Sequence, residues 1–145
     1  MPNHCENDLI VSGPKAEIER FIAAAVDPED GDNAIRLDNF VPLPPELLNY
    51  EDEYNWRIEH WGTKWDCYDF SYAKWSPKGR SWSTSFLTAW TPPDAAFIAI
   101  AKLFPKLTFN LRYYEGGCCY KGQLKVKGET IIAQWDGDYY GWRGG

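Results

Sequence analysis

The 145-residue sequence lacks most of the features that assign a chain to a functional class. It holds only two histidines, His4 and His60, and no cysteine pair spaced as C-x-x-C. It contains no phosphate-binding loop, nucleophile elbow or dinucleotide fingerprint. It shows neither a signal peptide nor an apolar run of membrane-spanning length. We therefore expect a cytoplasmic, non-membrane protein with no catalytic residue set, no cofactor and no metal.

The four cysteines give little support to a metal site. Cys5, Cys67, Cys118 and Cys119 should be reduced thiols in a cytoplasmic protein. A zinc site built from His4, Cys5 and the adjacent pair is an alternative, but neighbouring residues of a strand point to opposite faces. Small buried side chains are the favoured interpretation.

Aromatic residues are abundant and charge is unevenly spread. The chain has 8 Trp, 9 Tyr and 7 Phe, which supply large contact areas in cores and interfaces. The net charge is −6, with 14 acidic and 4 basic residues in 1–60 but 7 acidic and 11 basic in 61–145. The acidic residues concentrate in 27–38 and 46–53. An acidic chain argues against general nucleic-acid binding, which needs a basic footprint.

Hydrophobic periodicity predicts two helices among several strands. Residues 5–13 favour a strand, followed by a helix with Pro14 in its first turn that ends at Val26. Residues 91–105 are the clearest helix, which Thr91 would cap. Between the helices we expect a short strand in 34–43, a single helical turn in 42–50, and strands from 56 to 90 joined by a turn at 76–80.

The last third of the chain predicts a β-meander with two tight turns. A two-residue turn at 116–117 would place Phe109 opposite Leu124. A second turn at 128–129 would place Leu124 opposite Ala133. Both registers set apolar side chains against apolar side chains, which is the consistency expected of a real sheet.

This order of elements is typical of an α+β protein. A strand, a helix, two strands, a helix and further strands predict a ferredoxin-like sandwich, in which two helices cover one face of a mainly antiparallel sheet with extra strands. No repeat or linker interrupts the pattern, so we predict a single ferredoxin-like domain over residues 1–145.

Several motifs occur in a distinctive order along nearly the whole chain. They are NHCEN, FVPLPPEL, HWGTKWD, TAWTPP and FPKLTFNLRYYE. Together they resemble the YubB-type ferredoxin-like domain family of plasmid and phage proteins, although Cys118 and Cys119 depart from that pattern. The resemblance implies a ferredoxin-like fold and a mobile genetic element, and therefore the host cytoplasm. It brings no established activity and no catalytic residues.

The leading functional hypothesis is a small acidic accessory protein without enzymatic activity. Such a protein of a phage or plasmid would bind a host protein, and could thereby oppose host defence, because an acidic face complements a basic target. The candidate binding residues in the acidic segment are Glu51, Asp52 and Glu53. Nothing in the sequence predicts the oligomeric state.

A second hypothesis is single-stranded nucleic-acid binding on an aromatic and basic sheet surface. Ferredoxin-like sheets can stack bases on exposed aromatic side chains. The segment 68–80 combines aromatic and basic residues in this way. Four are aromatic and three are basic: Tyr68, Phe70, Tyr72, Trp75, Lys74, Lys78 and Arg80.

A third hypothesis places an enzyme site or small-molecule pocket at the HWGTKWD segment, residues 60–66. His60 and Asp66 would form a base and the group that orients it. Lys64 would face an anionic ligand held between Trp61 and Trp65.

A structural anchor is the simpler interpretation of the same segment. Gly62 would permit a backbone angle that other residues resist, and Thr63 or Asp66 would satisfy loop amides. If the ring of Trp65 is part of the core, its replacement by alanine should cost about 3–5 kcal/mol.

Overall fold

A computed structural model describes residues 2–26 and 35–140 of the chain. In these ranges the strands form one antiparallel sheet in the order β2-β3-β1-β4-β5-β6. The elements are β1 (His4–Ser12), α1 (Lys15–Ala25), η1 (Leu37–Asn39), α2 (Tyr50–His60), β2 (Tyr68–Trp75), β3 (Ser81–Ala89), α3 (Asp94–Leu103), β4 (Thr108–Glu115), β5 (Tyr120–Lys127) and β6 (Thr130–Asp138).

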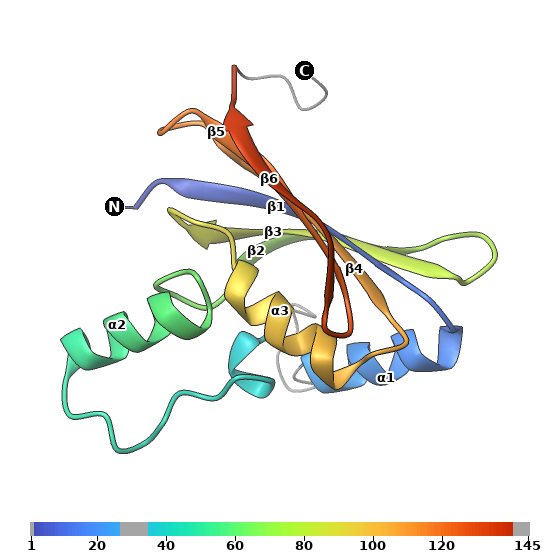
Figure 1. Ribbon diagram of the computed structural model, residues 1–145, viewed down its shortest axis with the longest axis horizontal. Coiled ribbons are helices and arrows are strands. Elements are labelled where there is room, and N and C mark those ends of the chain that lie inside the picture. The colour runs from blue at the N-terminus through green and yellow to red at the C-terminus, as the bar shows by residue number, and fades with distance from the viewer. Residues whose placement is uncertain (1, 27–34, 141–145) are drawn as a thin grey trace.

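Helices α1 and α3 pack on one face of this sheet (Figure 1). The strands β1 to β4 and these two helices have the order of a ferredoxin-like fold, and β5 and β6 extend the sheet beyond β4. This confirms the predicted α+β sandwich with extra strands. None of the helices in the described chain has the length and apolar composition that crossing a membrane requires.

The core lies between the sheet and the two covering helices. Trp82, Thr84 and Phe86 alternate along β3 as buried residues. Phe21 of α1 reaches the centre of the core, where the centroids of its ring and the Phe109 ring are 5.2 Å apart. Fully burying one such side chain contributes about 1.5–3 kcal/mol.

The predicted helix starts were wrong by a few residues. Helix α3 begins at Asp94 with Pro93 at the N-cap position, not with Thr91 as the cap. The Thr91 hydroxyl instead donates a hydrogen bond to the Gly62 carbonyl, 2.6 Å away. Pro14 is the N-cap residue of α1 and precedes its first turn.

The stretch between α1 and β2 contains the largest error of the sequence prediction. In place of the strand expected in 34–43, the described residues from 35 onward form an isolated bridge between Ile35 and Val26 and the short 3-10 helix η1. No helical turn forms in 42–49, and α2 occupies a stretch whose second half was predicted as strand. A local polar contact determines where this helix begins. The Asn49 side chain accepts a hydrogen bond from the amide of Asp52 at 3.0 Å and so caps the N-terminus.

The register between β4 and β5 differs from the prediction by two residues. Phe109 lies opposite Val126, and Leu124 lies opposite Leu111. The connection is four residues long because the Glu115 carboxylate accepts two amides within it, each at 2.7 Å. Since side chains alternate with a period of two, a shift of two keeps each residue on its predicted face.

The register between β5 and β6 follows the predicted turn only at its start. Val126 pairs with Ile131 next to the turn, but a bulge then shifts the strands. Ala133 therefore lies opposite Lys125 and not Leu124. Bulges of this kind insert an extra residue that no alternating pattern reveals.

Candidate functional site

The segment from Trp61 to Asp66 fastens the end of α2 to the rest of the fold. The ring of Trp61 is only 3% exposed, and its indole Nε1 donates to the Val41 carbonyl at 2.8 Å. The Trp61 carbonyl accepts from the amide of Ala96 in α3 at 3.2 Å. Trp61 is therefore an anchor between three segments.

Gly62 and Thr63 continue this anchor. Gly62 has φ +86°, a left-handed conformation that favours glycine, and a Cβ atom there would collide with the Asp94 carboxylate. Thr63 is fully buried, and its hydroxyl donates to the Ala89 carbonyl at 2.9 Å. The predicted backbone role of the glycine is confirmed.

Asp66 satisfies loop amides, as the anchor interpretation predicted. Its Oδ1 accepts hydrogen bonds from the backbone amides of Leu37 at 2.9 Å and Cys67 at 2.8 Å. Its Oδ2 accepts one from the backbone amide of Asp38 at 3.2 Å. Burial raises the pKa of this carboxyl above its usual value, and the three amides and the nearby Arg36 oppose that rise.

The proposed pairing of His60 with Asp66 does not form. His60 Nδ1 lies 2.9 Å from the Trp56 carbonyl, and its ring stacks on Trp56 with centroids 4.4 Å apart. Asp66 is engaged with backbone amides instead. The two side chains therefore do not combine as a base and the group that orients it.

Lys64 and Trp65 form the more accessible part of the segment. The ring of Trp65 is 37% exposed, and Lys64 Nζ lies 4.4 Å from its centroid. Trp65 is thus not a core side chain, and the large stability loss expected for a core ring applies to Trp61.

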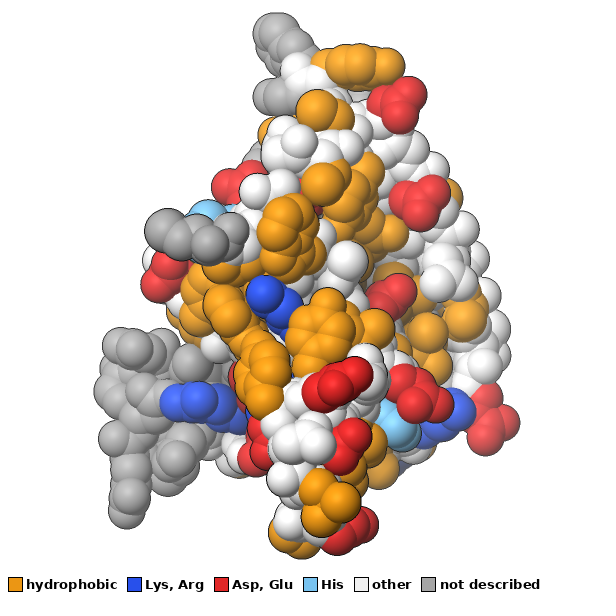
Figure 2. All heavy atoms as spheres, turned by 90° about the vertical axis from the view of Figure 1, so that its left-hand side faces the viewer, with side chains coloured by type: hydrophobic (Ala, Val, Ile, Leu, Met, Phe, Trp, Pro, Cys, Tyr) orange, Lys and Arg blue, Asp and Glu red, His pale blue; other side chains and the backbone are white. Residues whose placement is uncertain are grey.

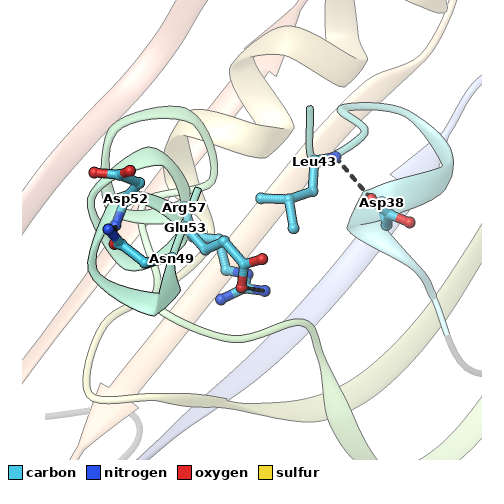
Figure 3. Close-up of polar contacts among 6 residues, drawn as sticks. All are labelled: Asp38, Leu43, Asn49, Asp52, Glu53 and Arg57. Carbon is cyan, nitrogen blue, oxygen red and sulfur yellow. Dashed lines mark hydrogen bonds and ion pairs between the residues drawn. The ribbon is translucent and has the colours of Figure 1, made fainter. Parts of the chain in front are cut away.

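An open hollow of about 790 Å³ lies between α2 and the segment 36–43. Figure 3 shows Glu53 and Arg57 of α2 projecting toward Leu43 on the far wall, where the Asp38 carboxylate accepts from the Leu43 amide at 2.9 Å. The lining residues are Arg36, Asp38, Asn39, Leu43, Tyr50, Arg57, Trp61, Trp65 and Asp66. The predicted pocket residues Trp61, Trp65 and Asp66 do meet here, whereas His60 and Lys64 are not among the lining residues.

The acidic residues of α2 do not form one patch. Successive helical residues differ in direction by about 100°, so Glu51, Asp52 and Glu53 point to three sides of the helix. Glu53 pairs with Arg57 at 3.5 Å, and all three acids favour the positive end of the helix dipole. Most of the other acidic segment, 27–34, lies outside the described residues.

Helix α2 exposes an apolar stripe that sequence reasoning missed. Tyr50, Tyr54 and Ile58 are spaced four residues apart and are 61%, 38% and 42% exposed. Leu48 just before the helix is 88% exposed, and α2 itself contains no buried residue. Figure 2 shows hydrophobic and acidic side chains intermingled on this side of the molecule. The four-residue spacing could have revealed the stripe if the segment had been recognised as helical.

The aromatic residues of β2 are divided between the two faces of the sheet. Tyr68 pairs with Leu87 and Tyr72 with Ser85, with an irregularity between them. Phe70 falls in this irregularity. Its ring stacks on that of Phe86, a core residue, with the ring centroids 5.4 Å apart. The prediction of one aromatic face on this strand is therefore wrong for Phe70.

Trp75 also belongs to the covered face. It pairs with Trp82, packs against the core, and has Lys15 Nζ 5.8 Å from its ring centroid. Lys74 lies on the opposite face, opposite Ser83.

The cysteines are free thiols, with Cys5 and Cys67 buried and Cys118 and Cys119 exposed. Burial raises the pKa of the Cys5 thiol to about 12. Within residues 2–26 and 35–140, no group of three or more His, Cys, Asp or Glu side chains is placed to hold a metal ion.

The fold and these contacts define the chain as a ferredoxin-like α+β domain with an inserted helix. It belongs to the family of the ferredoxin-like domain in Api92-like proteins, which matches residues 60–141. Helix α2 therefore lies almost entirely before the matched region.

The chain is also similar to a solved structure. The crystal structure of protein api92 from Yersinia pseudotuberculosis superposes with a TM-score of 0.65, covering 98% of this chain and 99% of that one. The two sequences are 9% identical, so this likeness concerns the fold. No curated protein matches the chain.

Proposed function

We propose that the chain is a non-enzymatic binding protein that docks on a partner protein through helix α2. The observation that carries the proposal is the exposed stripe of Tyr50, Tyr54 and Ile58 on a helix without buried residues. Hydrophobic side chains gathered on a surface mark interaction sites, whereas scattered ones are ordinary.

The stripe contributes little to the folding of this chain. Helix α2 has 11 residues, a length that is marginal in water without other support. Its support comes from the Asn49 cap, from the Trp61 anchor and from Trp56, which is partly buried and packs against the core on another side of the helix. The stripe is therefore available to another molecule.

The charges beside the stripe indicate the kind of partner. In helical geometry Glu51 borders the stripe on one side, and the ion pair of Glu53 with Arg57 borders it on the other. An amphipathic helix of this kind fits an apolar groove in a partner. Basic residues at the rim of that groove would complement Glu51, which would act on association rate and specificity.

The biological setting is part of the proposal. The resemblance to YubB-type domains suggests a phage or plasmid protein acting in the cytoplasm of its host. In that setting the partner is a host protein, and the effect of binding opposes a host defence.

The test compares a stripe variant with a matched control. Tyr54→Ser/Ile58→Ser removes two apolar side chains from α2, and Ile131→Ser/Ile132→Ser removes two of similar exposure from β6. Each tagged protein is used to capture proteins from host lysate. Each captured protein is then purified and titrated against the parent chain, the stripe variant and the β6 control. We expect the stripe variant to weaken binding by about tenfold or more, which is a loss of about 1.4 kcal/mol.

Unchanged melting temperatures would show that both variants fold. A partner that binds the stripe variant as tightly as the parent chain would reject α2 as the docking surface. An equal loss of affinity in the β6 control would indicate nonspecific hydrophobic binding and not a specific site on α2.

A further inference from the structure

The face of the sheet opposite α1 and α3 is a second unassigned surface. The described helices all lie on the other side (Figure 1). Strand pairing sets the side chains of this face in rows that run across the strands. The central row, read from β2 to β6, is Tyr72, Ser85, Asp8, Arg112, Gln123 and Trp135.

The neighbouring rows follow from the same pairing. On one side lie Lys74, Ser83, Ile10, Asn110, Lys125 and Ala133. On the other side lie Tyr68, Leu87, Glu6, Tyr114, Lys121 and Gly137. Tyr139 packs against Tyr114 with ring centroids 5.5 Å apart and covers part of this last row.

The open face is basic although the whole chain is acidic. Its three rows carry Lys74, Arg112, Lys121 and Lys125 against two acids, while the chain has a net charge of −6. One of the acids, Asp8, accepts a hydrogen bond from Ser85 at 2.6 Å and lies opposite Arg112. A basic face on an acidic protein is complementary to a polyanion and directs it to one surface.

Aromatic side chains stand at both ends of the central row. Tyr72 on β2 is 48% exposed and Trp135 on β6 is 44% exposed. The indole of Trp135 donates to Gln123 at 2.9 Å, and Gln123 donates to Asn110 at 2.8 Å. This chain of hydrogen bonds fixes the position of the tryptophan side chain before any ligand arrives.

From this arrangement we infer that the open face binds single-stranded nucleic acid across the strands. Bases stack on Tyr72 and Trp135, and phosphates contact Arg112, Lys121 and Lys125. Strands about 4.8 Å apart place the two aromatic side chains roughly 24 Å from one another, which is long enough for several extended nucleotides. A duplex keeps its bases stacked inside, so stacking on the sheet selects unpaired strands.

The test uses fluorescence anisotropy with labelled oligothymidine and oligouridine of about 15 nucleotides, and a duplex of the same length. We expect the chain to bind the single strands, and Lys121→Gln/Lys125→Gln to weaken binding. Each phosphate contact on a single strand contributes about 0.7 to the slope of log K against log salt, so this variant should lower the slope by about 1.4. Lys15→Gln/Lys102→Gln, which removes the same charge from the helices, should leave the slope unchanged.

Stacking is tested separately with two tryptophans of similar exposure. Trp135→Leu should raise the Kd for single strands by about tenfold. Trp65→Leu, on the α2 side of the molecule, should leave it unchanged. The α2 variant Tyr54→Ser/Ile58→Ser should also bind normally, so failure of this inference and failure of the docking proposal are distinguishable.

Three binding results would overturn the inference. They are absence of binding at low salt, equal affinity for the duplex, and equal loss in the helix-face and sheet-face variants. Self-association that Trp135→Leu abolishes would also overturn it, because a second copy of the chain would then occupy the face.

Discussion

Trp61 and Trp65 lie four positions apart and have different environments. Trp61 is 3% exposed and hydrogen-bonded through its indole, whereas Trp65 is 37% exposed with Lys64 beside its ring. The sequence alone did not distinguish which of the two rings anchors the segment, because both flank the turn at Gly62. The structure assigns the anchoring role to the first.

The two tryptophans should therefore differ in their effect on stability. We predict that Trp61→Ala lowers the free energy of unfolding by about 3–5 kcal/mol, through loss of buried contacts and of the hydrogen bond to Val41. Trp65→Ala should cost about 1 kcal/mol. Urea denaturation of both variants measures the difference, and equal losses would contradict the assignment.

Asp66 gives a pH-dependent prediction. Its pKa is raised above the ordinary value of 3.8, so the native state retains the proton to a higher pH than the unfolded chain does. The contribution of Asp66 to stability is therefore fully present below pH 3.8 and decreases as the pH rises through the native pKa.

The matched variant for this prediction is Asp66→Asn. We expect its deficit in the free energy of unfolding, relative to the parent chain, to be smaller at neutral pH than at acidic pH. Denaturation curves across the pH range provide the measurement. A deficit that grows toward neutral pH would show that the three amides outweigh burial and lower the pKa.

At the scale of elements, the β4–β5 pair shows how a wrong register can preserve the correct faces. The glycine pair suggested a two-residue turn, but the Glu115 carboxylate binds amides within a longer connection. Nothing in the alternating pattern distinguishes registers that differ by two residues. The error therefore changed which residues pair but not which are buried.

The corrected register places Gly122 beneath the ring of Tyr113. A Cβ atom at Gly122 would collide with the Tyr113 phenol, so Gly122→Ala should destabilise the fold by about 1–3 kcal/mol. Gly137 in β6 has no atom within 4 Å of the same position, so Gly137→Ala should change stability by less than about 1 kcal/mol. Thermal unfolding of the two variants would reject this register if they were equally stable.

Helix α2 shows where pattern reasoning fails at the element scale. Its residues include one acidic turn, two tyrosines and an isoleucine, with no buried member. The strongest signal in such a helix is the Asn49 cap and not a buried face. Hydrophobic periodicity identifies the elements that cover a core, so a helix whose contact with the core is a single partly buried side chain, Trp56, is easily missed.

For the whole molecule, the sheet separates two kinds of surface. One face is covered by α1 and α3 (Figure 1), and the other is open and carries the basic rows. Helix α2 presents its apolar stripe at the side. The sequence showed acidic and basic halves of the chain. Only the antiparallel arrangement brings basic residues from β2, β4 and β5 onto the same face.

The sequence by itself determined the fold class, the two covering helices and the buried faces of β3, β4 and β5, because local periodicity is imposed by burial. Phe21, Phe86 and Phe109 could be placed in the core on that basis. Tertiary structure decided the registers, the environments of Trp61 and Trp65, and the composition of both candidate surfaces. These depend on contacts between distant segments, such as Asp66 with Leu37, which local pattern does not encode.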